Sequence, residues 1–80
     1  MENVIRISSQ LGQVLRARRV KLVYNQTEAG AKVGVAQKTV SSLERHPEKS
    51  TVETLMRMLS ALELEMVIRP RGSPANKFPW

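Results

Sequence analysis

The stretch Gln26–Glu44, QTEAGAKVGVAQKTVSSLE, predicts two short helices joined by a tight turn at residues 33–35. Gly34 lies where the first helix should end, because glycine enters positive φ without the steric clash that other residues meet. The second helix, over 36–44, should have two unlike sides at about 100° per residue. Its inner side carries Ala36, Val40 and Leu43. Its outer side carries only polar residues: Gln37, Lys38, Ser41, Ser42 and Arg45.

This polar side has the chemistry needed to contact the edges of base pairs. Glutamine can make a bidentate contact to adenine, lysine can reach guanine O6 and N7, and serine can serve either base. The stretch therefore predicts a helix-turn-helix that binds double-stranded DNA. The base-reading residues we expect are Gln37, Lys38, Thr39, Ser41 and Ser42.

Composition limits the chain to one small helical domain. It has 80 residues, 41% of them apolar, with only three aromatic residues and no cysteine. A disulfide or a thiolate metal site is therefore excluded, and no apolar run approaches the ~18 residues of a membrane span. Nothing resembles a signal peptide, so we expect an intracellular, cytoplasmic protein.

Positive charge is concentrated in the first half of the chain. Eight Lys/Arg against three Glu give +5 for residues 1–45, and five against four give +1 for residues 46–80, matching the total of +6. A basic half that also holds the expected recognition helix points to a polyanion. A uniformly basic surface would fit a membrane or RNA equally well, and simple solvation of these side chains without a partner is the further alternative.

Residues 1–8 form a short lead-in, and residues 9–62 form the expected DNA-binding domain. A helix over about 10–21, capped by Ser8 or Ser9, should bury Leu11, Val14, Leu15, Arg18 and Leu22 on one face. Asn25 should cap the helix that starts at Gln26, and Gly30 inside it suggests close packing of a neighbour. Gln26 itself is placed to contact a phosphate through its side chain or its backbone N–H.

A last helix should follow the polar loop at 45–50, capped by Ser50 or Thr51. Its apolar stripe consists of Val52, Leu55, Met56, Leu59 and Leu62. The pattern then changes to a period of two, which predicts a β-strand over 63–69 that ends at Pro70. A lone strand has no partner in its own chain, so we expect it to pair with the same strand of a second copy through Leu64, Met66 and Ile68. The alternative is that this strand covers the helical core of its own subunit.

Residues 70–80, PRGSPANKFPW, have three prolines and no periodicity, which predicts a flexible tail. Its end holds Phe78 and Trp80, two of the three aromatic residues of the chain. A terminal aromatic residue with its carboxylate suits a pocket on a partner protein. An incidental tail is the alternative.

Residues 9–62 resemble the Xre-type helix-turn-helix domain of phage repressors. The resemblance rests on Gln26, Gly34-Val35, Thr39-Val40-Ser41 and Leu43-Glu44. With Leu11-Gly12, Leu15-Arg16, the run Ser50–Leu62 and the strand, the longer pattern is similar to HipB-type antitoxins, the DNA-binding partners of HipA-like serine/threonine kinase toxins. Trp80 resembles a tryptophan that ends some of these antitoxins and docks on the kinase.

The resemblance implies a mainly α fold of four or five helices, followed by one β-strand that pairs between subunits. It implies that Gln37, Lys38 and Ser42 read bases, that Thr39 and Ser41 lie near the backbone or base edges, and that Gln26 contacts a phosphate. It also implies an internal ion pair between Arg19 and Glu44, although the helical wheel favours Arg18 as the partner. Ala36 departs from the usual Ser or Thr cap, and Ala29-Gly30 departs from the usual Leu-Ala.

Catalysis finds no support, because His46 is the only histidine and lies in a polar loop without a nucleophile or metal ligands nearby. Glu63 and Glu65 fit a solvent-facing side of the strand. We therefore expect no enzyme, cofactor or metal, but a homodimeric repressor of a palindromic operator that is the antitoxin of a HipA-like kinase. The phosphate-neutralising residues we expect are Arg16, Arg19, Lys32 and Arg45. A stand-alone Xre-type regulator and a protein-interaction module remain the alternatives.

Overall fold

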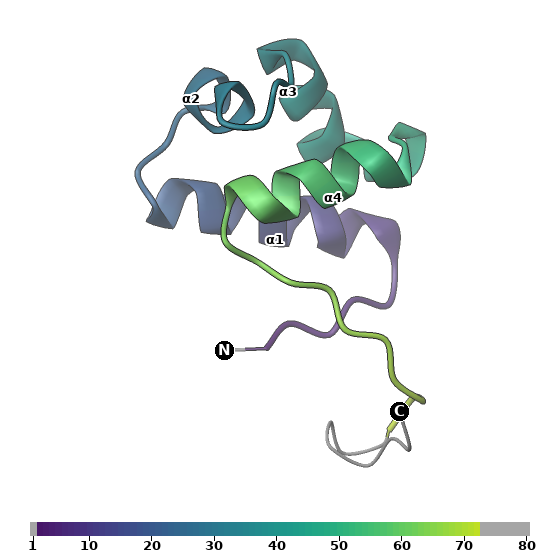
Figure 1. The fold of residues 1–80 in the computed structure, drawn as a ribbon. Coiled ribbons are helices and arrows are strands. Elements are labelled where there is room, and N and C mark those ends of the chain that lie inside the picture. The colour runs from purple at the N-terminus through teal and green to yellow at the C-terminus, as the bar shows by residue number, and fades with distance from the viewer. Residues whose placement is uncertain (1, 73–80) are drawn as a thin grey trace.

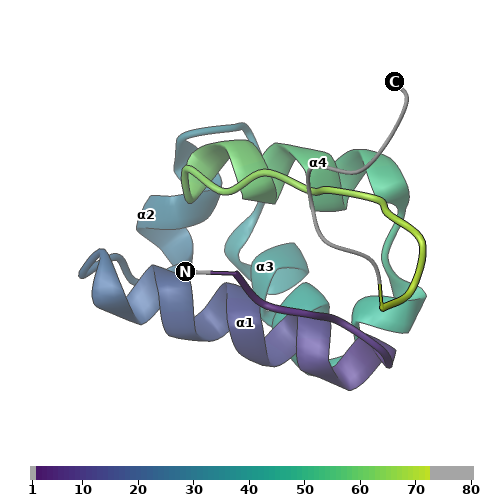
Figure 2. The same cartoon turned by 90° about the horizontal axis from the view of Figure 1, so that it is seen from below.

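The computed structural model describes residues 2–72. Four α-helices and one short 3-10 helix make up the described chain: α1 (Ser8–Lys21), α2 (Gln26–Ala31), α3 (Gln37–Arg45), η1 (Pro47–Lys49) and α4 (Val52–Ala61). Helices α2 and α3 lie together on one side of the pair formed by α1 and α4 (Figures 1 and 2). The first residues and the residues after α4 leave on the opposite side of the molecule (Figure 1). The mainly helical fold expected from the sequence is confirmed.

The core lies where the four helices meet. Its buried side chains are Leu15, Ala29, Val40, Leu43, Met58, Leu59 and Leu62. Each helix contributes on the spacing that the sequence predicts, with two exceptions: the stripe of α4 is displaced, and Ala36, the N-cap of α3, is exposed. Val52 and Met56, expected in the core, are exposed, whereas Met58 is buried. Leu55, Met58, Leu59 and Leu62 form the i, i+3, i+4, i+7 seam of this helix, and that seam leaves Val52 and Met56 at its sides.

Side-chain caps fix where two of the helices begin. Asn25 Oδ1 accepts from the Glu28 backbone N–H at 2.7 Å, and Glu28 Oε1 accepts from the Asn25 N–H at 2.9 Å, which is a reciprocal capping box. Thr51 Oγ1 accepts from the Thr54 N–H at 3.1 Å. Helix α1 differs from expectation, since it begins at Ser8 with Ile7 as its N-cap and no serine cap. Ala36 caps α3 without a side-chain hydrogen bond, as its apolar side chain requires.

The turn between α2 and α3 depends on glycine at two positions. Gly34 has φ +71°, and the Val35 N–H returns to the Gly30 carbonyl at 2.9 Å. A Cβ on Gly30 would lie 2.1 Å from the Val35 carbonyl oxygen. The expected packing reason for Gly30 is therefore confirmed, and it is the backbone of the turn itself that approaches.

A second close approach sets α1 against the end of α3. A Cβ on Gly12 would lie 2.2 Å from the Glu44 carbonyl oxygen and 3.4 Å from Cδ of Pro47, which is buried in η1. Only a glycine at this position lets α1 lie directly on the last turn of α3. This contact brings the side chains of α1 within reach of Glu44.

The expected β-strand is absent from residues 2–72, where residues 64–70 form no regular secondary structure. Helix α4 ends with Glu63 at φ +56° and the Leu64 N–H bonded to the Leu59 carbonyl at 2.8 Å, a Schellman-type cap. Leu64 then packs against the core of its own subunit, whereas Met66 and Ile68 are exposed. The alternative, a segment that covers its own subunit, thus holds for Leu64 only. Phe78 and Trp80 lie outside the described residues.

Candidate nucleic-acid interface

Helix α3 presents a polar outer side on a firmly packed helix. Val40 and Leu43 are at most 1% exposed, and they attach α3 to the core. Four of the five expected base-reading residues are exposed on α3: Gln37, Lys38, Thr39 and Ser42. The fifth, Ser41, is half-buried. Ala36, expected on the inner side, is also exposed. The outer side of α3 therefore has the amide, ammonium and hydroxyl groups that the sequence predicted.

Beneath this helix lies a buried ion pair. Arg19 Nε donates to Glu44 Oε2 at 2.6 Å and Arg19 Nη2 donates to Glu44 Oε1 at 3.1 Å, a bidentate arrangement. Arg19 Nη1 also donates to the Tyr24 carbonyl at 2.9 Å. The exposed fractions of the two side chains are 11% for Arg19 and 4% for Glu44. Hydrogen bonding to Glu44 raises the pKa of Arg19 against the opposing effect of burial, so Arg19 remains charged.

The pair that the resemblance implied is therefore present, and the helical wheel was wrong about Arg18. Arg18 Nε instead donates to the Leu62 carbonyl at 2.9 Å, at the end of α4. The structure also corrects the phosphate-neutralising role expected for Arg19. Its guanidinium is buried and held by Glu44 and Tyr24, so it is not available to a polyanion at the surface.

Glu44 is also the base of a hydrogen-bonded array that reaches the surface at α3. Gln26 Nε2 donates to Glu44 Oε1 at 3.1 Å, and Gln37 Nε2 donates to Gln26 Oε1 at 2.6 Å. We refer to Arg19, Glu44, Gln26 and Gln37 as the four-residue array. It runs from a buried charge on α1, through the last turn of α3 and the first turn of α2, to the first residue of α3.

The array determines how Gln37 is presented. One N–H of its amide is held by Gln26, which leaves the second N–H and the amide oxygen for a ligand. A donor and an acceptor side by side on one planar amide match the N7 acceptor and N6 donor of adenine. Gln26, expected at a phosphate, donates one N–H of its side-chain amide to Glu44 and accepts from Gln37 through its amide oxygen. Its second amide N–H and its backbone N–H at the start of α2 remain for a phosphate.

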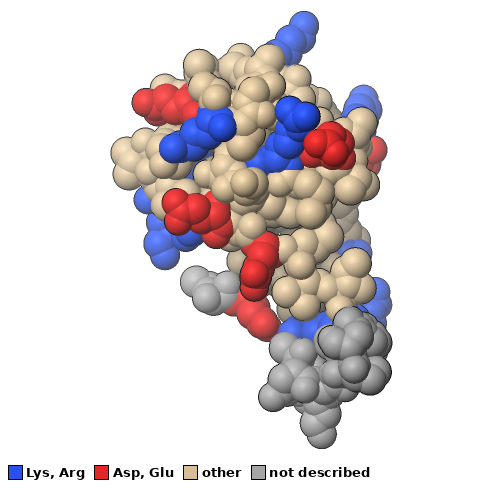
Figure 3. Space-filling view, in the orientation of Figure 1, with Lys and Arg blue, Asp and Glu red and all other residues tan. Residues whose placement is uncertain are grey.

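Three of the expected phosphate-neutralising side chains, Arg16, Lys32 and Arg45, are exposed. None of them lies within ion-pair distance of a carboxylate among residues 2–72. Lys32 Nζ lies 4.7 Å from the centre of the Tyr24 ring, a cation–π contact that holds it beside α2. In the view of Figure 3, Lys and Arg side chains lie over the upper part of the molecule with acidic side chains between them.

Sequence reasoning missed the loop beside α3. A hollow is lined by Lys38, Thr39 and Ser42 of α3, together with Lys49 at the end of η1, Thr51, which is the N-cap of α4, and Thr54 in the first turn of α4. Lys49 is exposed and extends the positive charge of Lys38 along the same surface. The sequence does show a lysine next to the Ser50-Thr51 helix cap, but only the fold reveals that this cap lies beside α3.

Residues 2–72 contain no group of three or more His, Asp and Glu side chains that could hold a metal ion. His46 Nδ1 lies 3.6 Å from Glu48 Oε2 in an exposed position. No helix in this part of the chain is long and apolar enough to cross a membrane.

The helix-turn-helix family model HTH_3 matches residues 15–68. The chain is 32% identical over 78 residues to the antitoxin HipB of Escherichia coli (strain K12), covering 90% of this chain and 89% of that protein. It is 30% identical over 60 residues to the antitoxin HipB of Escherichia coli O6:H1, covering 75% of this chain and 64% of that protein.

Solved structures show the same likeness in three dimensions. The HipB–O4 20mer complex superposes with a TM-score of 0.83 and 28% identity, covering 88% of this chain and 99% of that chain. The HipB chain of a HipA–HipB–O2–O3 complex gives the same TM-score, identity and coverage.

Proposed function

Because the chain belongs to the helix-turn-helix family and, within it, to the HipB-type antitoxins, we propose that it is a sequence-specific DNA-binding autorepressor. It acts as the antitoxin of a HipA-like serine/threonine kinase. The observation that carries this proposal is the polar, exposed outer side of α3, with Gln37 held in place by the four-residue array. The chain is not an enzyme, which agrees with the family to which it belongs.

Base reading is assigned to the outer side of α3. Gln37 contacts adenine through the free donor and acceptor of its amide, and Lys38 and Ser42 contact neighbouring base edges. Thr39 lies toward the DNA backbone. Ser41, which is half-buried, contributes a hydroxyl at the margin of this surface.

Phosphate contacts are assigned to exposed cations on α1, α3 and η1 and after α2, and to one backbone group. Arg16, Lys32, Arg45 and the missed Lys49 provide free cations, and the backbone N–H of Gln26 provides a neutral donor at the start of α2. Arg19 is left out of this set because it is buried against Glu44. Each cation that neutralises a phosphate releases counterions, so operator binding should weaken steeply with salt.

The functional protein is a homodimer on a palindromic operator. Residues 1–8 are the lead-in, 9–62 the DNA-binding domain, 63–69 the dimerising segment, and 70–80 the tail. Residues 64–70 have no regular structure in the single chain, and Met66 and Ile68 are exposed. Pairing with the same segment of a second copy would turn this segment into an intermolecular two-stranded ribbon. The two α3 helices would then enter major grooves about one helical turn, or a multiple of it, apart.

The kinase partner is supported by a matched structure in which a HipB chain stands in complex with HipA. We assign Phe78 and Trp80, at the end of the tail, as the residues that anchor in a pocket of the kinase. Pull-down from the native host with the full chain should recover a kinase-fold protein, and removal of residues 78–80 should reduce that recovery. Recovery of DNA and the chain alone with both versions would leave a stand-alone regulator.

The DNA-binding proposal is tested by Gln37→Ala, with Gln13→Ala as its matched control on the exposed side of α1. Selection of bound sequences from a random pool should show relaxed preference at one base pair of each half-site for Gln37→Ala. Affinity for the cognate site should fall by about 1–3 kcal/mol per contacted base pair. Gln13→Ala should keep both the affinity and the sequence profile. An unchanged profile for Gln37→Ala would remove the assignment of α3 as the recognition helix.

A further inference from the structure

Two neighbouring arginines attach α1 to different parts of the molecule. Arg19 binds Glu44 through hydrogen bonds of 2.6 and 3.1 Å, and so fixes α3 against α1. Arg18 is the preceding residue, and its Nε donates to the Leu62 carbonyl at 2.9 Å, where α4 ends. Within residues 2–72 this is the one hydrogen bond between α1 and the residues from 52 onward. Helix α1 therefore connects the recognition helix with the point at which the segment after α4 starts.

The Leu62 carbonyl depends on Arg18 for a donor. The last carbonyls of a helix have no N–H partner within the helix, and no backbone N–H in residues 2–72 donates to the Leu62 oxygen. Leu62 is 0% exposed, so water does not replace this donor. Arg18 is half-buried, and no carboxylate in the described part of the chain lies within ion-pair distance of it. The contact between the two is thus a specific tie between α1 and the end of α4.

The peptide unit held by Arg18 lies directly before a sharp change of chain direction. At its other end, the Glu63 N–H donates to the Ser60 carbonyl at 3.2 Å, so both polar groups of this unit are bonded. Glu63 then has φ +56°, in the left-handed region that residues other than glycine rarely adopt. The Leu64 N–H closes the turn on the Leu59 carbonyl at 2.8 Å. The direction in which the chain leaves α4 is therefore set within residues 62–64.

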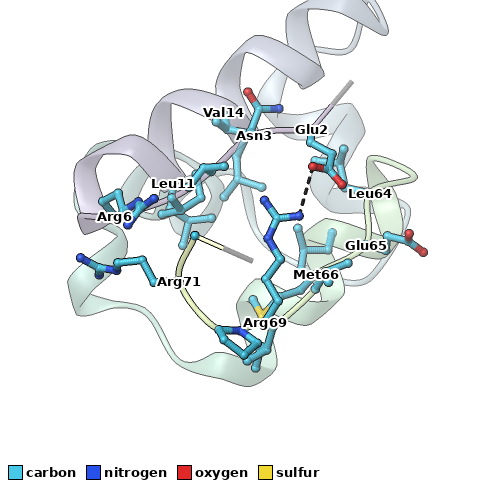
Figure 4. A pocket seen from close by; sticks show the side chains of 18 of the residues that line it. Glu2, Asn3, Arg6, Leu11, Val14, Leu64, Glu65, Met66, Arg69 and Arg71 are labelled. Carbon is cyan, nitrogen blue, oxygen red and sulfur yellow. Dashed lines mark hydrogen bonds and ion pairs between the residues drawn. The ribbon is translucent and has the colours of Figure 1, made fainter. Parts of the chain in front are cut away.

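The residues after Leu64 add little to this direction. The backbone groups of residues 65–71 make no hydrogen bond to another backbone group within residues 2–72. Figure 4 shows Arg69 reaching from this segment to Glu2, and the Arg69 Nη1 to Glu2 Oε1 distance is 3.3 Å. The Glu2 side chain is 69% exposed, and exposed ion pairs contribute little to stability. The hydrogen bond from Arg18, by contrast, acts at the buried point where the direction is determined.

We propose that Arg18 is a positioning residue that determines which half-site spacing of the operator the dimer prefers. This inference rests on the proposed homodimer, in which residues 63–69 join the two copies. Arg19 fixes α3 to α1, and Arg18 fixes to the same helix the point from which the joining segment leaves. The recognition helix and the start of the segment therefore keep one relative orientation in each copy. When two copies assemble, that orientation determines the distance and the rotation between the two recognition helices.

Operators of graded spacing test the proposal. Two copies of the half-site that the native chain selects from a random pool are joined, and their spacing is changed one base pair at a time. Each added base pair moves one half-site by about 3.4 Å and rotates it by about 34°. The native chain should bind the best spacing at least about tenfold more tightly than the neighbouring spacings, because a displaced half-site forces the DNA or the protein to deform.

Two substitutions separate the hydrogen bond of Arg18 from its charge. Arg18→Gln keeps an N–H donor at the position of the arginine Nε, since both nitrogens are bonded to Cδ, whereas Arg18→Met places a methyl group there. Both remove the positive charge. Arg18→Gln should keep the native spacing preference, and Arg18→Met should bind the neighbouring spacings within about threefold of the best one. The two variants should bind a single half-site within about twofold of each other, because the contacts beneath Gln37 are unchanged.

A second background keeps the comparison possible if Arg18→Met weakens the fold. Glycine adopts the positive φ of Glu63 without strain, so Glu63→Gly should stabilise the end of α4. Arg18→Met and Arg18→Gln are then compared in this background, with folding verified by circular dichroism. The loss of spacing preference should again be confined to Arg18→Met.

Equal spacing profiles for Arg18→Met and Arg18→Gln would overturn the proposal, because this hydrogen bond would then not set the spacing. An equal loss of affinity for both variants at every spacing, with a weaker salt dependence, would also overturn it and would make Arg18 a phosphate contact. Sedimentation velocity of the native chain separates these results from failure of the dimer. If the native chain is monomeric and shows no spacing preference, the proposed homodimer fails, and this inference fails with it.

Discussion

The outer side of α3 is held in place by contacts within a single chain, whereas the segment after α4 makes few such contacts. Gln37 is supported by Gln26, by buried Glu44 and by Arg19, so the geometry of the recognition surface is fixed inside a single subunit. Ile68 makes no comparable contact and is 78% exposed. The difference indicates that base reading is preorganised within each subunit, whereas the spacing of two subunits is determined only when they assemble.

The largest effect we expect comes from removing the carboxylate on which the array depends. Glu44→Ala would leave the Arg19 guanidinium buried without its partner and would also take the acceptor from Gln26. Loss of one member of a buried ion pair costs about 3–5 kcal/mol, which approaches the whole stability of a domain this small. Urea denaturation followed by circular dichroism should show the variant largely unfolded at conditions where the native chain is folded. A loss below about 1 kcal/mol would show that the pair is not structural.

A double substitution distinguishes support of the fold from support of Gln37. Arg19→Met with Glu44→Leu replaces both charges by apolar side chains of similar size, and such replacements are often neutral or stabilising. We expect stability to recover while cognate DNA affinity stays reduced, because Gln26 still lacks its acceptor and Gln37 is no longer held. Full recovery of affinity would mean that the array does not orient Gln37.

Much of this site could be predicted from sequence, because its determinants are local. Asn25, Gly34 and the alternation of Val40 and Leu43 with polar residues follow from capping, positive φ and helical period. The Arg19–Glu44 pair came from family resemblance, whereas the helical wheel favoured Arg18. A wheel places both arginines by angle alone and cannot show that the carbonyl of Leu62 lies in reach of one of them.

A smaller loss is expected where α1 touches the backbone of α3. In an exposed helix, Gly→Ala stabilises by about 1 kcal/mol, yet a Cβ at Gly12 would overlap the Glu44 carbonyl oxygen. The backbone would have to move, so we expect Gly12→Ala to destabilise by roughly 1–3 kcal/mol. Urea denaturation measures it, with Ser60→Ala on the exposed side of α4 as the control that should change stability by less than about 0.5 kcal/mol. Stabilisation by Gly12→Ala would contradict the close approach.

The parts that sequence could not supply are those that depend on neighbours distant in the chain or on another chain. Val52 and Met56 have helical spacing with Leu59, but only the packing of α4 in the folded chain determines which side of the stripe is covered. Apolar and polar residues alternate over 63–69. In one chain, Glu63 and Leu64 complete the end of α4, and residues 65–69 make no backbone hydrogen bond to another backbone group within residues 2–72. A β-strand is defined by pairing, so a pattern within one sequence cannot establish it.

The smallest effect on folding should come from the segment that makes the fewest contacts. Ile68→Ser should change the free energy of unfolding of the dilute, monomeric chain by less than about 0.5 kcal/mol, because its side chain is already exposed there. At concentrations where the native chain dimerises, the same variant should show a lower Tm, since association stabilises the folded state by mass action. Thermal melts at several concentrations measure both effects. A concentration-independent loss would mean that Ile68 packs within its own subunit, and the segment would then resemble α3 in being completed by a single chain.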